Sequence, residues 1–128
     1  EEIIPIIKTV DDVIAQSIYM KDKQREHFMV LYLNARNELI FKKPMFVGTL
    51  NSNIVHPREI FGEAIKQNAA FVIFCHNHPS GVSEPSQTDL AINKRLVEAG
   101  KIMGIEVLDH IIITKTKVFS FKESGLMN

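Results

Sequence analysis

The stretch HNHPSGVSEPSQTD, residues 76–89, places side chains that could do chemistry directly after an apolar run, AAFVIFC (69–75). In an extended segment, residues i and i+2 project from the same face, so His76 and His78 are expected to point together. Two imidazole nitrogens on one side of a strand end suit zinc. Asp89 lies in the first turn of the helix predicted to follow the loop, where its carboxylate could become the third ligand.

Such a ligand set would leave one position open on the metal. Two nitrogens and one oxygen occupy three of the four positions of a tetrahedral zinc, as in catalytic rather than structural zinc sites. A zinc ion lowers the pKa of bound water from about 15.7 toward about 7, which gives hydroxide at neutral pH. The residue types and their spacing therefore predict a site for one zinc ion per chain.

A structural role is also open for the end of this stretch. Ser86-Gln87-Thr88-Asp89 has the form of a capping box, in which Ser86 accepts a hydrogen bond from the helix and Asp89 interacts with the Ser86 backbone or the helix dipole. A lone histidine is also more often structural than a ligand. We predict that Asp89 serves as both cap and ligand, and the capping interpretation alone stays open.

The elements that must position these residues follow from the hydrophobic pattern. Apolar residues that recur every three or four positions predict helices, and short apolar runs predict strands. Strands alternate with helices in the second half, which implies a sheet with helices packed on it, and an earlier hairpin adds antiparallel pairing. Pro44 suggests an interruption or an edge strand. The pattern predicts helices over residues 9–22, 57–69 and 86–104, and strands over 27–34, 39–48, 70–76, 105–114 and 117–122.

Length and composition bound the class of protein. A chain of 128 residues is the size of one domain, here 1–128, and it starts EEIIPI without a methionine, as a fragment of a longer chain would. The formal net charge of zero gives no dominant electrostatic footprint for nucleic acid. The single cysteine, Cys75, cannot form an internal disulfide, which favours a reducing, cytoplasmic location. No apolar run approaches about 20 residues, so no membrane span is expected.

The spacing also carries a resemblance. His76-x-His78, then seven residues, Ser86, two residues and Asp89 resembles the JAMM motif of the MPN/JAB metalloprotease superfamily. The chain is still more similar to the RadC family, whose members are named as DNA repair proteins. This resemblance lies in the segments HNHPSG, PSQTD, LDHIII and GTLNSNIVHPREIF (48–61). The resemblance implies a three-layer α/β/α sandwich with a mixed sheet, of cytidine-deaminase-like (JAB/MPN) architecture. It also implies zinc held by the two histidines and the aspartate.

The resemblance assigns catalytic roles to two further residues. JAMM enzymes use an upstream glutamate as general base on the water at the zinc, and the motif places this role on Glu26, in REHFMVLYL (25–33). The alternative for Glu26 is a solvated charge at a strand start. Ser86 would stabilise the oxyanion of the tetrahedral intermediate. The resemblance thus implies a zinc-dependent hydrolase, a metallopeptidase or isopeptidase that cleaves an amide bond in a peptide or protein.

Competing interpretations remain. Proteolytic JAMM members usually have Ser or Thr between the histidines, where this chain has Asn77, as in the RadC pattern. A DNA-repair-associated module that binds nucleic acid or protein around a non-catalytic zinc is the alternative, with the nucleic-acid partner resting on family analogy. A nucleobase deaminase is excluded because its H-x-E and P-C-x-x-C elements are absent. Asp109 and His110 either support the zinc histidines or form a buried hydrogen-bonded pair that holds a strand end.

Overall fold

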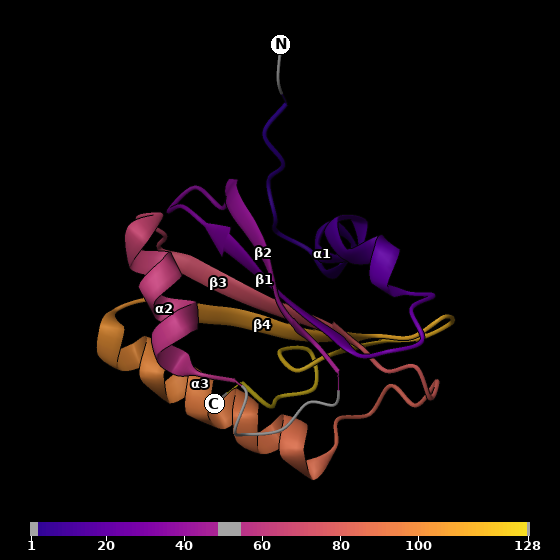
Figure 1. Ribbon diagram of the computed structural model, residues 1–128. Helices are drawn as coiled ribbons and strands as arrows, with labels where there is room; N and C mark the ends of the chain where they lie inside the picture. Colours follow the sequence, from indigo (N-terminus) through magenta and orange to yellow (C-terminus); the bar gives the residue numbers. More distant parts are fainter. Residues whose placement is uncertain (1–2, 49–54, 128) are drawn as a thin grey trace.

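The computed structural model describes residues 3–48 and 55–127, so residues 49–54 of the GTLNSNIVHPREIF stretch lie outside the described part. Within it, five strands form a mixed sheet in the order β2-β1-β3-β4-β5 (Figure 1). Strands β3 and β4 are parallel, and the other neighbours are antiparallel. The elements, in chain order, are α1 (Val10–Ser17), the 3-10 helix η1 (Ile18–Met20), β1 (His27–Leu33), β2 (Leu39–Val47), α2 (Pro57–Lys66), β3 (Phe71–Asn77), α3 (Gln87–Met103), β4 (Glu106–Ile113) and β5 (Val118–Ser120).

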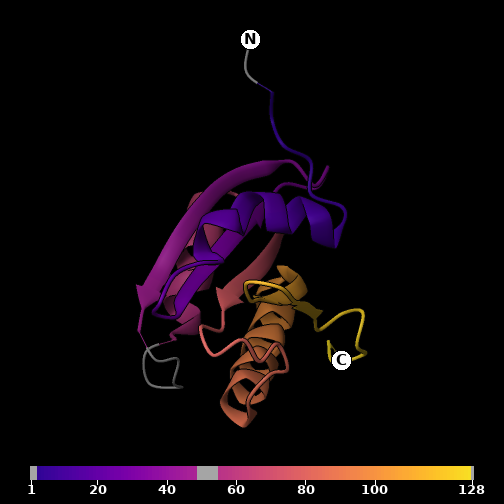
Figure 2. The ribbon, with the colours of Figure 1, turned by 90° about the vertical axis from the view of Figure 1, so that its right-hand side faces the viewer.

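Helices cover both faces of this sheet, which confirms the predicted three-layer α/β/α sandwich. Helix α1 lies on one face, and α2 and α3 lie on the other (Figures 1 and 2). Alternate residues of the interior strand β1 enter two separate apolar cores: Phe28 packs on the α2 and α3 side, and Met29 on the α1 side. A strand buried on both faces needs a nearly continuous apolar sequence, which explains the run HFMVLYL.

Each helix and strand expected from the sequence is present, with ends shifted by a few residues. The largest difference is the helix expected over 9–22, which ends at Ser17 and continues as η1. The buried Ser17 hydroxyl donates to the Val13 carbonyl oxygen at 2.8 Å. Such a bond competes with the regular helical pattern and often bends a helix, so the chain turns earlier than the periodicity predicts.

Two further expectations can be compared with the described residues. Pro44 lies in β2, which pairs only with β1 and is an edge strand, as the sequence suggested. Among the helices of residues 3–48 and 55–127, none is long and apolar enough to cross a membrane.

Helix α3 carries the aspartate of the predicted site and is fixed at both ends. Ser86 caps its start, and Gly104 ends it in the left-handed conformation, with φ 72°. The left-handed region is open to glycine at no steric cost, so the helix stops there. Because α3 links β3 to the parallel strand β4, the first turn of α3 lies beside the C-terminal end of β3.

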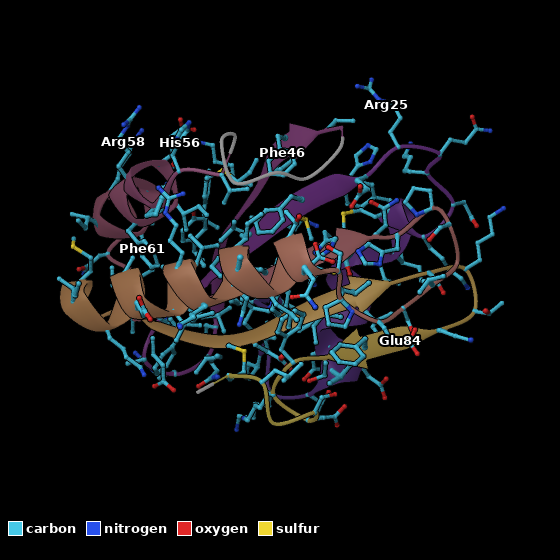
Figure 3. The ribbon with its side chains drawn as sticks, turned by 90° about the horizontal axis from the view of Figure 1, so that it is seen from below. Arg25, Phe46, His56, Arg58, Phe61 and Glu84 are labelled. Atoms are coloured by element: carbon cyan, nitrogen blue, oxygen red, sulfur yellow. The ribbon has the colours of Figure 1, made fainter. Side chains whose placement is uncertain are left out.

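Substituting Gly100 tests how tightly α3 packs on the sheet. A Cβ atom at Gly100 would collide with the backbone oxygen of Ile105 and lie 3.3 Å from Phe61, which reaches from α2 toward α3 (Figure 3). We expect Gly100→Ala to lower the free energy of unfolding by about 1–3 kcal/mol. In Gly62→Ala, the new Cβ has no atom within 4 Å, so we expect a gain of about 0.5–1 kcal/mol from helix propensity. Urea unfolding of both variants measures this difference, and equal effects would contradict the packing argument.

Candidate metal centre

The predicted metal ligands meet where β3 ends and α3 begins. His76 is the penultimate residue of β3, His78 follows the strand, and Asp89 lies in the first turn of α3. The Nε2 atoms of His76 and His78 are 2.9 Å apart. The Asp89 carboxylate reaches both rings, with Oδ1 3.4 Å from His76 Nε2 and Oδ2 3.0 Å from His78 Nε2. The structure therefore brings all three residues to one point, with His76 and Asp89 buried.

Hydrogen bonds on the far side of each ring determine which nitrogens carry protons. The Val82 carbonyl oxygen lies 2.8 Å from His78 Nδ1 and can only accept, so Nδ1 of a neutral His78 is protonated. In the same way, Asn93 Oδ1 lies 3.1 Å from His110 Nδ1. His110 Nε2 is then free to accept from His76 Nδ1, at 2.9 Å. As a result, the neutral rings of His76 and His78 both present an unprotonated Nε2 to the same point.

Two lone pairs and a buried carboxylate that face one another need a positive charge between them. Burial alone would lower the pKa of His78, but hydrogen bonds with Asp89 and the Val82 carbonyl, together with the nearby carboxylate charges, outweigh burial and raise that pKa. Burial would raise the pKa of the Asp89 carboxyl, but hydrogen bonds with His76 and His78 hold it below its ordinary value. A proton on His78 is one source of the charge, and a metal ion is the other. Two imidazole nitrogens and a carboxylate oxygen are a donor set that fits zinc.

Asp89 has the geometry of both a helix cap and a metal ligand, the two roles considered from the sequence. Its Oδ2 accepts a hydrogen bond from the Ser86 backbone N–H at 2.8 Å, and its own N–H donates to Ser86 Oγ at 3.1 Å. The capping box is therefore present. Because this carboxylate also faces both histidines, capping and metal binding are geometrically compatible.

Two roles were considered for Asp109 and His110: His110 supports a predicted zinc histidine, and Asp109 forms the hydrogen bonds that hold a strand end. The fully buried His110 ring lies between His76 and Asn93 and fixes the His76 tautomer, as partners of metal-binding histidines do. Burial, and then the neighbouring His76, hold the pKa of His110 well below its ordinary value, so this ring stays neutral. Asp109 accepts from its neighbour's backbone, from the Lys122 backbone and from the Ser120 hydroxyl, which holds the end of the sheet together.

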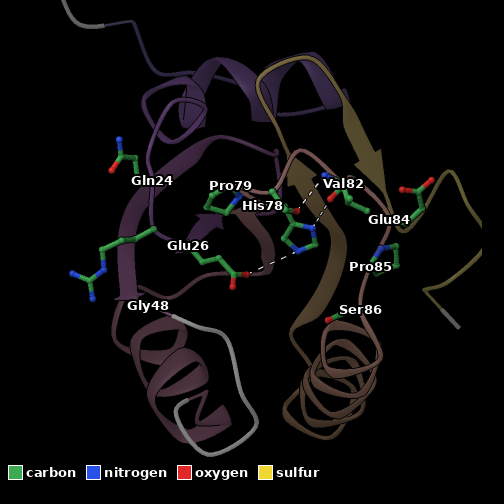
Figure 4. Close-up of a pocket in the computed structure, with 11 residues that line it drawn as sticks. Gln24, Glu26, Gly48, His78, Pro79, Val82, Glu84, Pro85 and Ser86 are labelled. Atoms are coloured by element: carbon green, nitrogen blue, oxygen red, sulfur yellow. Dashed lines mark hydrogen bonds and ion pairs between the residues drawn. The ribbon is translucent and has the colours of Figure 1, made fainter.

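Glu26 lies on the solvent-facing side of the predicted metal ligands. Its side chain is 25% exposed, and Oε1 lies 4.0 Å from His78 Nε2. Ligand atoms of Glu26, His76 and His78 all lie within 4.8 Å of one another, so this carboxylate can also reach an ion held there. A cavity of about 740 Å³ opens beside it, with Glu26 pointing toward His78 and Ser86 on another wall (Figure 4). Of the two predicted catalytic residues, Glu26 thus faces the histidines, and the exposed Ser86 lines the cavity that leads to them.

Asn77 holds the segment that carries Glu26, a role that the sequence reasoning did not identify. Its buried side chain points away from the histidines, and its Oδ1 accepts from the His27 backbone N–H at 2.6 Å. Its amide group donates to the carbonyl oxygens of Arg25, at 3.0 Å, and Lys23, at 3.4 Å. These bonds bracket Glu26 on both sides. The available signal was an amide side chain at the end of an apolar strand, where a buried polar group needs partners.

Substituting Asn77 and Asn93 separately distinguishes their roles. We expect Asn77→Ala to lower the free energy of unfolding by about 1–3 kcal/mol, because it leaves buried backbone groups unpaired. Amide hydrogen exchange at His27 should accelerate in this variant, while zinc affinity changes little. We expect Asn93→Ala to weaken zinc binding about 10–100-fold, because it releases the His110 ring that orients His76. Hydrogen exchange and zinc competition measure both effects, and identical profiles for the two variants would contradict this assignment.

A family model described as a RadC-like JAB domain matches residues 7–126. The chain belongs to the RadC family. The resemblance read from the HNHPSG and PSQTD stretches is therefore confirmed, and the RadC-like JAB domain accounts for nearly all of the chain.

Curated relatives of this RadC-like domain carry the name UPF0758 protein. One from Geobacillus kaustophilus (strain HTA426) is 54% identical over 106 residues, which are 83% of this chain and 47% of the relative. One from Bacillus cereus (strain B4264) is 56% identical over 106 residues, with the same shares. The chain therefore spans about half the length of the curated relatives it matches.

Proposed function

We propose that this RadC-like domain is a zinc-dependent hydrolase of the JAMM type that cleaves an amide bond in a peptide or protein. The observation that carries the proposal is the convergence of two imidazole Nε2 atoms and a buried carboxylate on one point. A second carboxylate, Glu26, stands on the open side of that point, beside a cavity large enough for part of a peptide. Catalytic zinc sites have this composition, with three protein ligands and an open position.

The residues of the chain divide the proposed reaction among them. A zinc ion held by His76, His78 and Asp89 would supply the positive charge that makes water acidic at neutral pH. Glu26, on the open side, takes a proton from the attacking water and returns it to the leaving nitrogen of the amide. Ser86 Oγ accepts from the Asp89 backbone N–H, so its own hydrogen is available to the oxyanion that develops on the substrate.

Metal content tests this proposal directly. The protein is purified without chelator or nickel resin, and its zinc is measured beside the double variant His76→Ala/His78→Ala. We expect about one zinc per chain in the parent and none in this variant. The double variant His27→Ala/His56→Ala also removes two histidines but leaves the centre intact, so it should keep its zinc. A parent that takes up no zinc even from added metal would overturn the proposal and leave the capping box as the role of Asp89.

The pH dependence of zinc binding gives a second check. Hydrogen bonds with Asp89 and the Val82 carbonyl raise the pKa of His78 above its ordinary value in the metal-free protein, so this ring keeps its second proton to a higher pH than a free imidazole does. Zinc must displace that proton, because only the neutral imidazole is a ligand. We expect zinc affinity to fall about tenfold per pH unit as pH drops below that raised pKa. Competition with a chromophoric chelator between pH 8 and pH 6 measures it, and a constant affinity over this range would contradict the assignment of His78.

A further inference from the structure

A second pocket adjoins the candidate metal centre. Its volume is about 210 Å³, and it shares a wall made of His78, Pro79 and Ser80 with the larger cavity. The remaining walls come from the segment after η1 and from the turn that joins β4 to β5. A molecule that extends out of the cavity along this wall would enter the second pocket.

Positive charge distinguishes this pocket, which we call the lysine pocket. Lys21, Lys23 and Lys115 line it, and no acidic side chain from the described part of the chain does. The ammonium groups of these three lysines form no ion pair or hydrogen bond with any residue in the described ranges 3–48 and 55–127. By contrast, the ammonium group of Lys43 pairs with Glu63 at 3.0 Å. Three unpaired like charges around a small pocket, in a chain of zero net charge, attract an anionic group.

We infer that the lysine pocket binds an acidic side chain of a peptide substrate, within a few residues of the amide that is cleaved at the metal centre. This inference rests on the proposed function for the position of the scissile bond. The pocket and the cavity share a wall of three residues, and an extended peptide advances about 3.3 Å per residue, so the acidic residue must lie close to the scissile amide.

The charges around the cavity favour a peptide over a nucleic acid. A nucleic-acid strand carries a phosphate at every nucleotide. A strand that crosses from the lysine pocket into the cavity would meet two carboxylates, Glu26 and Glu84, against one basic side chain, Arg25, among the described residues that line the cavity. Carboxylates repel phosphates at short range. Among the described residues, no Phe, Tyr or Trp side chain lines either space, and the one aromatic ring there, His78, is a predicted metal ligand. A peptide with one or two acidic residues satisfies the lysines without placing charge beside the glutamates.

Peptide binding tests the inference without reference to catalysis. The zinc-free protein is titrated with acetylated, amidated triglutamate, and backbone amide shifts are followed by NMR. We expect saturable shifts at Ser80, Gly81, Lys115 and Thr116. The variant Lys21→Gln/Lys23→Gln/Lys115→Gln should bind the peptide about tenfold more weakly, because surface charge pairs contribute modestly and three are lost. The control Lys66→Gln/Lys94→Gln/Lys101→Gln removes the same charge from exposed positions on α2 and α3 and should bind as the parent does.

Three results would overturn the inference. The first is an absence of saturable shifts at the lysine pocket, and the second is an equal loss of binding in both triple variants, which would indicate diffuse attraction. The third is tighter binding of hexathymidylate than of triglutamate, which would indicate a nucleic-acid strand. Zinc content is measured separately in each variant. Triglutamate binding in a protein that takes up no zinc would refute the proposed function but leave the anion site in place. Zinc uptake without peptide binding would refute the anion site but leave the proposed function in place.

Discussion

Replacing Glu26 by glutamine is expected to reduce amide hydrolysis about 10²–10⁴-fold in kcat, the usual contribution of general acid–base catalysis, while the protein keeps its zinc. Glutamine has the shape of glutamate but cannot take a proton from water. The Glu26 carboxylate lies on the open side of the centre, 4.0 Å from His78 Nε2, where an attacking water would approach. The assay uses zinc-loaded protein and a panel of peptide and isopeptide substrates with acidic residues near the cleaved bond.

Glu84 supplies a matched control for this variant. It lines the same cavity as Glu26, but it is exposed and forms no ion pair with the histidines of the described part. We expect Glu84→Gln to retain hydrolysis within the error of the assay. Unchanged hydrolysis in Glu26→Gln would show that Glu26 is a solvated charge. A zinc-loaded parent that cleaves none of the substrates would instead favour a binding module around a non-catalytic zinc.

Asp89→Asn is expected to weaken zinc binding by more than the 10–100-fold that is typical of losing a partner behind a ligand. The substitution removes the negative charge that faces both rings. It leaves a carbonyl oxygen that can still accept from the Ser86 backbone N–H, so the start of α3 stays capped. Chelator competition should therefore show a large loss of zinc affinity, and urea unfolding of the zinc-free protein should show a smaller change in stability.

Ser86→Ala is expected to have the opposite effect to Asp89→Asn, with a loss of stability and little change in zinc affinity. It removes the hydroxyl that accepts from the Asp89 backbone N–H, at a cost of about 0.5–2 kcal/mol in the free energy of unfolding. The Asp89 carboxylate keeps its position through the Ser86 backbone N–H, so zinc affinity should be retained. If Asp89→Asn instead bound zinc as the parent does, Asp89 would be a cap and not a ligand.

The convergence of His76, His78 and Asp89 was predictable because the three residues lie in one strand-loop-helix segment. Alternation along a strand places His76 and His78 on one side, and the following helix returns Asp89 to the same sheet edge. Glu26 was found from the family motif, since it lies 50 residues before His76 in the sequence. The structure then shows that β1 and β3 are paired, with Phe28 opposite His76, which brings the two regions together.

The residues that support the predicted ligands were predictable only in part, because the sequence offered support of the histidines as one of two alternatives for His110 and gave no role to Asn93. His110 contacts His76 only because β4 adds in parallel beside β3, and Asn93 contacts His110 only because α3 packs across that strand. Both contacts depend on register and helix rotation, which a single sequence does not specify. The unpaired lysines are also dispersed in the sequence, and their common pocket follows from the loop after β3.

The two outer strands of the sheet affect how the molecule behaves at high concentration. Exposed strand edges offer unpaired N–H and C=O groups to other copies of a chain, and this is a common route to aggregation. Here one outer strand, β2, carries two lysines and Pro44, which has no N–H to offer, and the other, β5, has only three residues. Neither presents a long uninterrupted row of hydrogen-bonding groups. We therefore expect the molecule to stay dispersed at the high concentrations that NMR titrations need.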